Sequence, residues 1–517
     1  MSEEWMRERV DKLKGEVNRM FEASKTMTAA NAVTLVDTVE RLGIRRHFRD
    51  EINFALRRIR ADEQEFANSN DLHIIALRFR LLRQHGFWVS ADVFNKFKDS
   101  NGSFSSAGLC DKTKDLLSLY NAAHMAIPGE TILDDAITFT RRQLEAVKGK
   151  LGSPMLEQVS RALDIPLPRF MERLEAMHYV IEYEMEEKHD AVLLELARLD
   201  FNHVRSIYLK ELSALSLWWR ALFEDVNLNY SRDRIVENYF WTIGMIPWEE
   251  SSRSRIILTK IIGLATLMDD TYDVHATFEE CQRFDEAIQR WDESAVSILP
   301  DYLHALYIQT LSHFNNEFKD MMKSHEKHRV SYLIKDYKVQ SKLYLQEAKW
   351  SNENTLPTFK EQVDVSAVSS FVPALCLVVL VGAEEDVATK EAFEWALGMP
   401  EMYIGSGKIG RFLNDVASYK KGKNKKDVAS SIECYVKENG VTGEEAAAAI
   451  TAMVEHAWRR MNQEYMEMDR AALPAADIVV GTSRTLEVIY LGGRDAYTFG
   501  RELKDIIVPL LLEPIPI

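Results

Sequence analysis

Apolar residues recur every three or four positions along most of the chain, which is the spacing of one face of an α-helix. The stretch from Val33 to Ile59 shows this spacing on both sides of a break at Gly43. The pattern continues through residues 73–86, 90–98, 112–124, 131–150 and 168–187. Alternating β-branched runs with hairpin turns are not found in the sequence. The pattern therefore predicts an all-α protein.

The helical pattern changes near residue 200, after which longer and more apolar stretches begin. The two most apolar segments, at residues 255–268 and 366–382, both lie beyond this point. At 517 residues the chain exceeds the roughly 250 to 300 residues at which a single core stops growing. We therefore expect two helical domains. Residues 1–205 would form an α-barrel or stacked hairpins, and residues 206–517 a helical bundle around a cavity.

The composition argues against several classes of protein. Apolar residues make up 46% and charged residues 28% of the chain, which is typical of a folded soluble protein. The formal net charge of −16 argues against a general nucleic-acid binder. The four cysteines lack the spacing of a zinc site or a disulfide framework, which indicates a reducing compartment; they are Cys110, Cys281, Cys376 and Cys434.

The sequence shows neither an apolar signal core nor a Ser/Arg-rich, acid-poor transit segment at its N-terminus. It also shows no uninterrupted apolar run of about 18 residues that would span a bilayer. We therefore expect a cytoplasmic monomer without stable membrane insertion.

An aspartate cluster follows the apolar run Ile261–Met268. If the helix continues, Asp269 and Asp273 lie one turn apart, where like charges repel. Desolvation beside apolar surface adds on the order of several kcal/mol unless a cation compensates. Mg²⁺ does so with one or two carboxylates, waters and substrate phosphate oxygens. The cluster therefore indicates a phosphate-bearing substrate held through metal; the alternative is a solvated helix end.

A second polar pair, Asn414 and Ser418, lies one helical turn apart after Gly410. Both side chains carry oxygen atoms that suit a hard cation. Taken alone, this spacing is more typical of hydrogen bonds on a helix surface.

Together, the two motifs resemble those of class I terpene synthases of the plant sesquiterpene type, and the resemblance covers nearly the whole chain. Further matching segments are Leu81–Gly86, Arg232–Arg234, Glu237–Trp241, Ala429–Tyr435, Tyr490 and Asp495–Tyr497. The resemblance implies a helical N-terminal domain and a catalytic metal-binding bundle. It also implies Mg²⁺-dependent ionisation of farnesyl diphosphate, cyclisation to a C15 terpene and release of diphosphate.

The resemblance also implies roles for individual residues. Asp269 and Asp273 would hold two Mg²⁺ ions, with Asp270 supporting them, and Asn414 and Ser418 would hold the third. Mn²⁺ is a possible substitute. Arg232, Arg234 and Arg411 would bind the diphosphate, because guanidinium forks suit phosphate oxygens. Residues with expected roles at the carbocation are Trp241, Tyr490, Tyr497 and Asp495, and Pro373 would break a helix beside the cavity.

The chain departs from the family pattern at Gly422, where the second motif usually ends in Glu. This change predicts weaker Mg²⁺ binding at that motif. The Arg-Arg-x8-Trp segment that often precedes the first helix in relatives is also missing, which bears on closure of the site.

Three alternatives stay open at this point. A monoterpene synthase would use geranyl diphosphate, although the missing plastid targeting segment favours farnesyl diphosphate. A chain-elongating prenyltransferase would carry two Asp-rich motifs, whereas the second motif here begins with Asn414. A non-enzymatic helical scaffold would show no divalent metal requirement.

Overall fold

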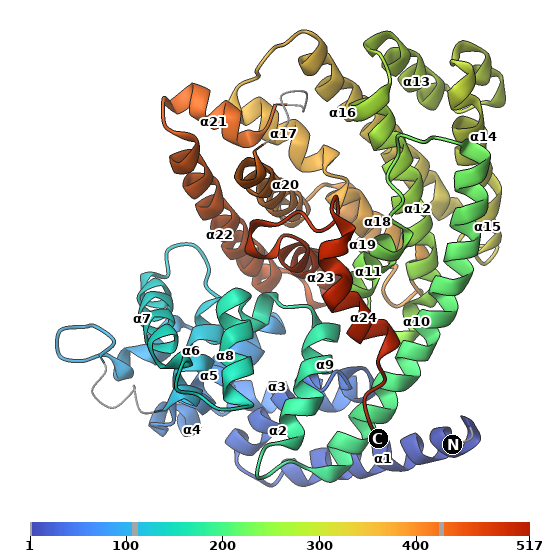
Figure 1. Cartoon of the computed structure of the whole chain (residues 1–517). Coiled ribbons are helices and arrows are strands. Elements are labelled where there is room, and N and C mark those ends of the chain that lie inside the picture. The colour runs from blue at the N-terminus through green and yellow to red at the C-terminus, as the bar shows by residue number, and fades with distance from the viewer. Residues whose placement is uncertain (1–2, 106–111, 423–428) are drawn as a thin grey trace. The chain divides into compact units, whose positions relative to one another are not determined.

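The computed structural model describes residues 3–105, 112–422 and 429–517, which form a succession of helices (Figure 1). Within these ranges, the single pairing of extended segments is an isolated antiparallel bridge between Lys98 and Phe104. The predicted all-α fold is therefore confirmed. The chain divides into two compact units.

Unit 1 comprises Met1–Ile207 with Asn462–Arg470 and Val508–Ile517. Its first nine helices are α1 (Glu3–Ser24), α2 (Ala29–Arg41), α3 (Arg49–Ala61), α4 (Glu63–Asn68), α5 (Leu72–Gln84), α6 (Thr113–Ala123), α7 (Thr131–Lys148), α8 (Met155–Asp164) and α9 (Glu172–Glu184). Consecutive helices such as α5, α6 and α7 pack against one another. The predicted helix at residues 90–98 is instead a 3-10 segment, Ala91–Phe97.

Helix α10 (Ala191–Val226) runs without interruption from unit 1 into unit 2, and the division falls between Ile207 and Tyr208. The change of pattern near residue 200 therefore does not mark the start of a helix, and the predicted boundary between residues 205 and 206 falls inside α10. Asp200, at the point where the pattern changes, is a buried carboxylate. It accepts hydrogen bonds from Arg46 at 2.7 Å and from His47 at 2.6 Å. Long-range pairing thus keeps this polar residue inside a continuous helix.

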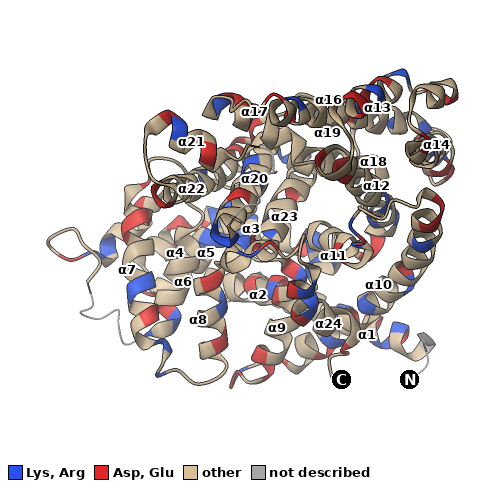
Figure 2. Ribbon diagram, turned by 45° about the horizontal axis from the view of Figure 1, so that its top comes forward, with Lys and Arg blue, Asp and Glu red and all other residues tan. Residues whose placement is uncertain are grey.

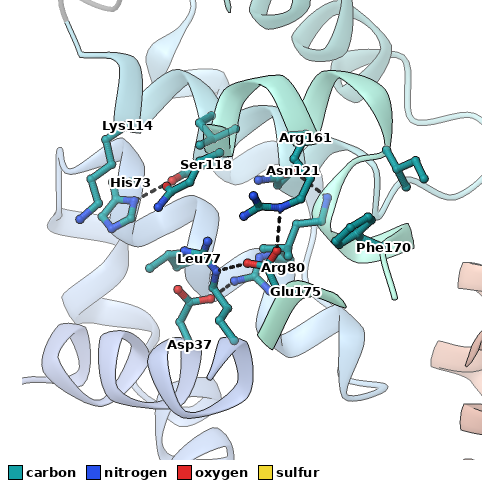
Figure 3. Close-up of a pocket in the computed structure, with 16 residues that line it drawn as sticks. Asp37, His73, Leu77, Arg80, Lys114, Ser118, Asn121, Arg161, Phe170 and Glu175 are labelled. Atoms are coloured by element: carbon teal, nitrogen blue, oxygen red, sulfur yellow. Dashed lines mark hydrogen bonds and ion pairs between the residues drawn. The ribbon is translucent and has the colours of Figure 1, made fainter. Parts of the chain in front are cut away.

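Unit 1 contains a small cavity of about 60 Å³ lined by ion pairs (Figure 3). The Nε of Arg161 donates to Glu175 at 3.1 Å, and Arg80 pairs with Asp37. Burial lowers the pKa of His73 to about 4, so its imidazole is neutral near pH 7. Because each of these guanidinium groups already has a carboxylate partner, we interpret the cavity as a structural network that joins α2, α5, α8 and α9.

Unit 2 comprises Tyr208–Met461 and Ala471–Ile507. Its helices include α11 (Ile235–Met245), α12 (Ser252–Asp270), α13 (Phe278–Arg290), α14 (His304–Ser312), α16 (Val330–Asn352), α17 (Phe359–Ser369), α18 (Val372–Gly382), α19 (Lys390–Leu397), α20 (Glu401–Lys421), α21 (Ser431–Asn439), most of α22 (Gly443–Glu467) and α23 (Leu473–Ile489). Every residue of α18 is buried, and this helix packs against α12, α16, α20 and α23. Helix α18 is therefore the centre of the bundle.

One segment, Phe359–Gly382, is long and apolar enough to cross a membrane by length and composition. The sequence predicted no uninterrupted apolar run of this length, and Ser366, Ser369 and Ser370 do interrupt the apolar residues of this segment, although its mean hydropathy is high. The segment is not a single straight helix, since it breaks between α17 and α18. Because 83% of its most apolar 18-residue stretch is buried inside the protein, the segment forms part of the core of unit 2.

Acidic and basic residues are interspersed along the helices (Figure 2). Three cysteines, Cys281, Cys376 and Cys434, are free and buried, which agrees with the absence of a disulfide pattern in their spacing. Cys110 lies outside the described residues.

Candidate active site

A cavity of about 700 Å³ opens inside unit 2. Its walls come from α11, α12, α16, α17, α18, α20 and α23, together with the segment of residues 490–503 that follows α23. The predicted residues that line it are Arg232, Trp241, Asp269, Asp270, Asp273, Arg411, Asn414, Ser418, Gly422, Tyr490, Asp495 and Tyr497. This volume falls within the range of small-molecule sites, and motifs far apart in the sequence meet around it.

The aspartate cluster lies where α12 changes its geometry. The α-helix ends at Asp270, and Thr271–His275 form a single π-helical turn. A continuing α-helix would have placed Asp273 one turn after Asp269, but Asp273 lies on the wider π-helical turn, which holds an extra residue. Such turns often occur at functional sites. Both Asp269 and Asp273 nevertheless line the cavity.

The two outer aspartates form an electrostatically strained pair. Burial raises the pKa of Asp269, and burial together with the nearby Asp269 and Glu347 raises the pKa of Asp273 well above its usual range. Asp269 accepts a hydrogen bond from Arg232 at 2.7 Å. Among the described residues, no hydrogen bond or ion pair reaches the Asp273 carboxylate. A cation bound between these groups would relieve the repulsion, so this donor set fits a divalent metal.

Asp270 points back toward the loop that precedes α11. Its Oδ2 accepts hydrogen bonds from the Ser231 hydroxyl at 2.8 Å and the Arg232 amide at 2.7 Å, and its Oδ1 pairs with the Arg232 guanidinium at 2.8 Å. Asp270 thus fixes the position of Arg232 at the cavity.

Helix α20 presents Arg411, Asn414 and Ser418 to the same cavity at helical spacing. The carboxylates of Glu347 and Asp415 raise the pKa of Arg411 despite its burial, so it stays charged. Glu347 lies on α16, accepts a hydrogen bond from Ser369 at 2.9 Å, and has its pKa raised by burial. The sequence did not single out Glu347, because an isolated Glu within a helical pattern carries no motif.

Asn414 and Ser418 of the second motif offer neutral oxygen atoms to the cavity. Asn414 donates to Asp495 at 3.5 Å, and Ser418 carries a hydroxyl group. The adjacent Asp415 accepts hydrogen bonds from the amide and hydroxyl of Ser431, so it anchors α21 instead. Gly422 ends α20 with a φ of 74° and carries no side chain. This group therefore fits a hard cation less well than the aspartate pair does.

The segment of residues 490–503 closes one side of the cavity with aromatic residues. The ring of Tyr497 meets Trp241 edge to face, with centroids 5.5 Å apart. Its hydroxyl lies 2.8 Å from both Thr266 and Asn238. Burial raises the pKa of Tyr497 to about 12, so the phenol is protonated near pH 7. Two polar residues for which the sequence predicted no role thus hold this tyrosine in place.

Arg234 does not line the cavity in this structure. Its guanidinium donates to the carbonyl oxygens of Tyr497 at 3.0 Å and Thr498 at 2.7 Å. The residue predicted to bind diphosphate therefore holds the backbone of residues 497–498, whereas Arg232, two positions earlier, faces the aspartates.

The helix break beside the cavity lies slightly before the predicted position. Ser370 ends α17, and Phe371 adopts a left-handed backbone with a φ of 64°. Pro373 lies in the first turn of α18, where its missing N–H costs no helical hydrogen bond. Residues 369–372 all line the cavity, as the resemblance implied for a break here.

Comparison with known proteins places this geometry in a family. Residues 1–163 match the family model of the terpene synthase N-terminal domain, and residues 222–460 match that of the metal-binding domain of the terpene synthase family. Eudesmanediol synthase from Zea mays is 54% identical over 516 residues, which are 99% of this chain and 92% of that protein. The chain belongs to the terpene synthase family.

Two further terpene synthases are similar over nearly the whole chain. A sesquiterpene synthase from Cananga odorata is 38% identical, over 99% of this chain and 90% of its own. Isoprene synthase from grey poplar (Populus x canescens), solved with three Mg²⁺ ions and dimethylallyl-S-thiolodiphosphate, is 32% identical. It superposes with a TM-score of 0.90 over 99% of this chain and 97% of its own.

The predictions of a terpene cyclase and of a sesquiterpene synthase are therefore confirmed, and a non-enzymatic scaffold is excluded. The terpene synthase contains the family's metal-binding domain, so it uses a divalent metal ion. A prenyl diphosphate is accordingly its class of substrate.

Proposed function

We propose that this terpene synthase ionises farnesyl diphosphate and cyclises the resulting carbocation to a C15 product, with release of diphosphate. The observation that carries the proposal is the division of one cavity into two parts. Carboxylates and guanidinium groups gather at Asp269, Asp273, Arg232 and Arg411, and an apolar and aromatic remainder surrounds Trp241. The similar maize and Cananga enzymes, a eudesmanediol synthase and a sesquiterpene synthase, support the C15 chain length.

The polar part of the cavity would hold the metal and the diphosphate. Asp269 and Asp273 supply the carboxylates for two Mg²⁺ ions, and Asn414 and Ser418 supply neutral oxygens for a third. The three ions in poplar isoprene synthase support this number; Mn²⁺ is a possible substitute. When bound, the metal ions supply positive charge that stabilises the leaving diphosphate. Arg232 and Arg411 bind diphosphate oxygens through their guanidinium forks.

The apolar part of the cavity would shape and protect the carbocation. The hydrocarbon chain contacts Ile262, Ala265, Leu375 and Leu486, which exclude water, and the ring of Trp241. Aromatic faces attract cations by about 0.5–2 kcal/mol, so they stabilise positive charge without reacting with it.

The 490–503 segment would act in the later part of the reaction. Tyr490, Asp495 and Tyr497 line the cavity beside Trp241, so we assign them to the carbocation, with Asp495 and Tyr497 as candidates for proton transfer. Arg234 would act on the substrate indirectly, by holding the backbone of residues 497–498.

The remaining assignments also stay proposals. Residues 1–205 would be the N-terminal helical domain and residues 206–517 the catalytic domain. We further propose that the enzyme is a cytoplasmic monomer without stable membrane insertion.

The decisive test is incubation of the purified protein with farnesyl diphosphate, with and without Mg²⁺, followed by gas chromatography and mass spectrometry. A C15 hydrocarbon or alcohol that forms only with Mg²⁺ is expected. Parallel reactions with geranyl and geranylgeranyl diphosphate define the chain length. A C10 product at higher kcat/KM from geranyl diphosphate would contradict the proposal.

Gly422→Glu is expected to lower the Mg²⁺ concentration for half-maximal rate by about fivefold, equivalent to roughly 1 kcal/mol. The new carboxylate would lie one turn beyond Ser418, and no atom of the described, non-adjacent residues lies within 4 Å of an added Cβ. Because Gly422 has a φ of 74°, any side chain there should cost about 1–2 kcal/mol of stability. Gly422→Ala is the matched control, since it adds the strain without the carboxylate. An equal shift in the Mg²⁺ titration of both variants would refute the prediction.

A further inference from the structure

One side chain contacts both ends of the π-helical turn that carries Asp273. The hydroxyl of Tyr230 lies 3.0 Å from the hydroxyl of Thr271, the first residue of the turn. The ring of Tyr230 stacks on the imidazole of His275, the last residue, with centroids 4.2 Å apart and the two planes 5° from parallel. Asp273 lies between these two contacts in the chain. Tyr230 therefore spans the whole turn.

The loop that carries Tyr230 also holds the residue just before the turn. The hydroxyl of Ser231 and the backbone amide of Arg232 both donate hydrogen bonds to the carboxylate of Asp270. Three consecutive residues of this loop thus contact the end of α12 and both ends of the turn.

The direction of the Asp273 side chain depends on the geometry of this turn. Single π-helical turns are rare within helices, and each residue of an α-helix adds a rotation of about 100° around the helix axis. A turn that reverted to α-helical geometry would therefore point the Asp273 carboxylate in another direction. Mg²⁺ demands near-ideal octahedral coordination, and contacts behind the metal ligands typically set their orientation.

We propose that Tyr230 and His275 are positioning residues, whose stacked rings hold the π-helical turn and so orient Asp273 for metal binding. This inference rests on the proposed function. The stack joins the turn to the loop before α11, and the contact between the hydroxyls of Tyr230 and Thr271 fixes the other end of the turn. Loss of the stack should therefore weaken metal binding without removing any metal ligand.

His275 separates positioning from a direct contact with the substrate. Tyr230 is among the residues that line the cavity, whereas His275 is exposed and is not among the described residues that line it. The ring of His275 contacts Tyr302 edge to face, with centroids 5.1 Å apart, in addition to the stack on Tyr230. An effect of replacing His275 on metal binding would therefore have to pass through the turn.

The competing explanation is that the stack only stabilises the fold. Its loss would then lower the unfolding temperature without changing the dependence on Mg²⁺. Tyr332→Ala is the matched control, because the ring of Tyr332 stacks on Phe393 with centroids 5.2 Å apart. Neither of these two rings is among the described residues that line the cavity.

The experiment is isothermal titration of the full-length protein with inorganic diphosphate, at limiting and at saturating Mg²⁺. At limiting Mg²⁺, His275→Ala is expected to raise the Kd about fivefold, equivalent to roughly 1 kcal/mol, the order of one aromatic pair. Tyr230→Leu should raise it about tenfold, because the hydroxyl contact is lost as well. Saturating Mg²⁺ should bring both variants to within about twofold of the wild type. His275→Phe, which keeps a stacked ring, and Tyr332→Ala should stay within about twofold at both concentrations.

The double variant Tyr230→Leu/His275→Ala tests whether the two residues act through one contact. Because both substitutions break the same stack, the double variant should raise the Kd about tenfold, as Tyr230→Leu alone does. Independent effects would instead multiply to about fiftyfold. Circular dichroism checks that each variant is folded, and His275→Ala, at an exposed position, carries the test if Tyr230→Leu does not fold.

Several results would overturn the inference. One is a folded His275→Ala protein that binds diphosphate as tightly as the wild type at limiting Mg²⁺. Others are an increase of about fiftyfold in the double variant, or a loss of affinity in His275→Phe or Tyr332→Ala as large as in His275→Ala. In all of these cases the proposed function stands if the wild type binds diphosphate with Mg²⁺. A wild type that binds none with Mg²⁺ would overturn both.

Discussion

Asp273→Asn is expected to lower kcat/KM for farnesyl diphosphate by about a thousandfold while leaving the protein folded. The carboxylate lines the cavity and is a proposed metal ligand, so its loss removes positive charge where the diphosphate leaves. Losing one preorganised electrostatic group in an active site typically costs about 10²–10³ in rate. The measurement is steady-state turnover of farnesyl diphosphate at saturating Mg²⁺.

Stability should respond in the opposite direction. Repulsion from Asp269 and Glu347 disfavours a charge at Asp273, so a neutral Asn relieves it, and without metal the unfolding temperature should stay equal or rise. Asp301→Asn is the control, since Asp301 is a fully exposed carboxylate that does not line the cavity. A large fall in unfolding temperature for Asp273→Asn would mean that the aspartate is structural.

The second large effect is expected for Arg411→Met, which keeps much of the side-chain volume but removes the charge. We expect kcat/KM to fall by at least a hundredfold, because the diphosphate loses a bidentate partner. Stability should fall as well, by roughly 3 kcal/mol, since buried Glu347 loses its main compensating charge. Turnover and denaturant unfolding measure the two quantities separately.

The double variant Arg411→Met/Glu347→Gln separates the two effects. Removing both charges should recover most of the lost stability, since neither group is then left unpaired. It should not recover activity, because the diphosphate contact is still missing. Recovery of turnover in the double variant would show that Arg411 serves the fold and not the substrate.

The spacing of apolar residues was sufficient for the helices, whereas most of the predicted residues that line the cavity came from the resemblance to terpene synthases. The aspartate cluster indicated a metal site by itself, but Asn414 and Ser418 became candidates only through that resemblance, and the structure places both pairs on the same cavity. The π-helical turn was not predicted, since it depends on packing around α12 and leaves no local signal. Glu347 was missed because only folding brings α16 beside Arg411.

Contacts between residues distant in the sequence also explain why the two arginines of the loop before α11 have different roles. Arg232 and Arg234 look equivalent in the sequence, but their partners differ. Asp270 holds Arg232 beside the aspartates, whereas Arg234 donates to carbonyl groups more than 260 positions later in the chain. The continuous helix α10 has a similar cause, because Asp200 is compatible with a buried helix only when Arg46 and His47 reach it. Partners distant in the sequence decided both outcomes.

The contact of Arg234 with backbone carbonyls has a consequence for how this enzyme can diversify. Main-chain oxygens are the same for every amino acid, so the hydrogen bond from Arg234 to the carbonyl oxygen of Thr498 does not depend on the side chain at that position. Substitutions there can change the contour presented to the carbocation without loosening the segment. The position of the segment and the shape of the cavity wall can thus change independently. A single substitution can therefore alter the product while the segment keeps its position.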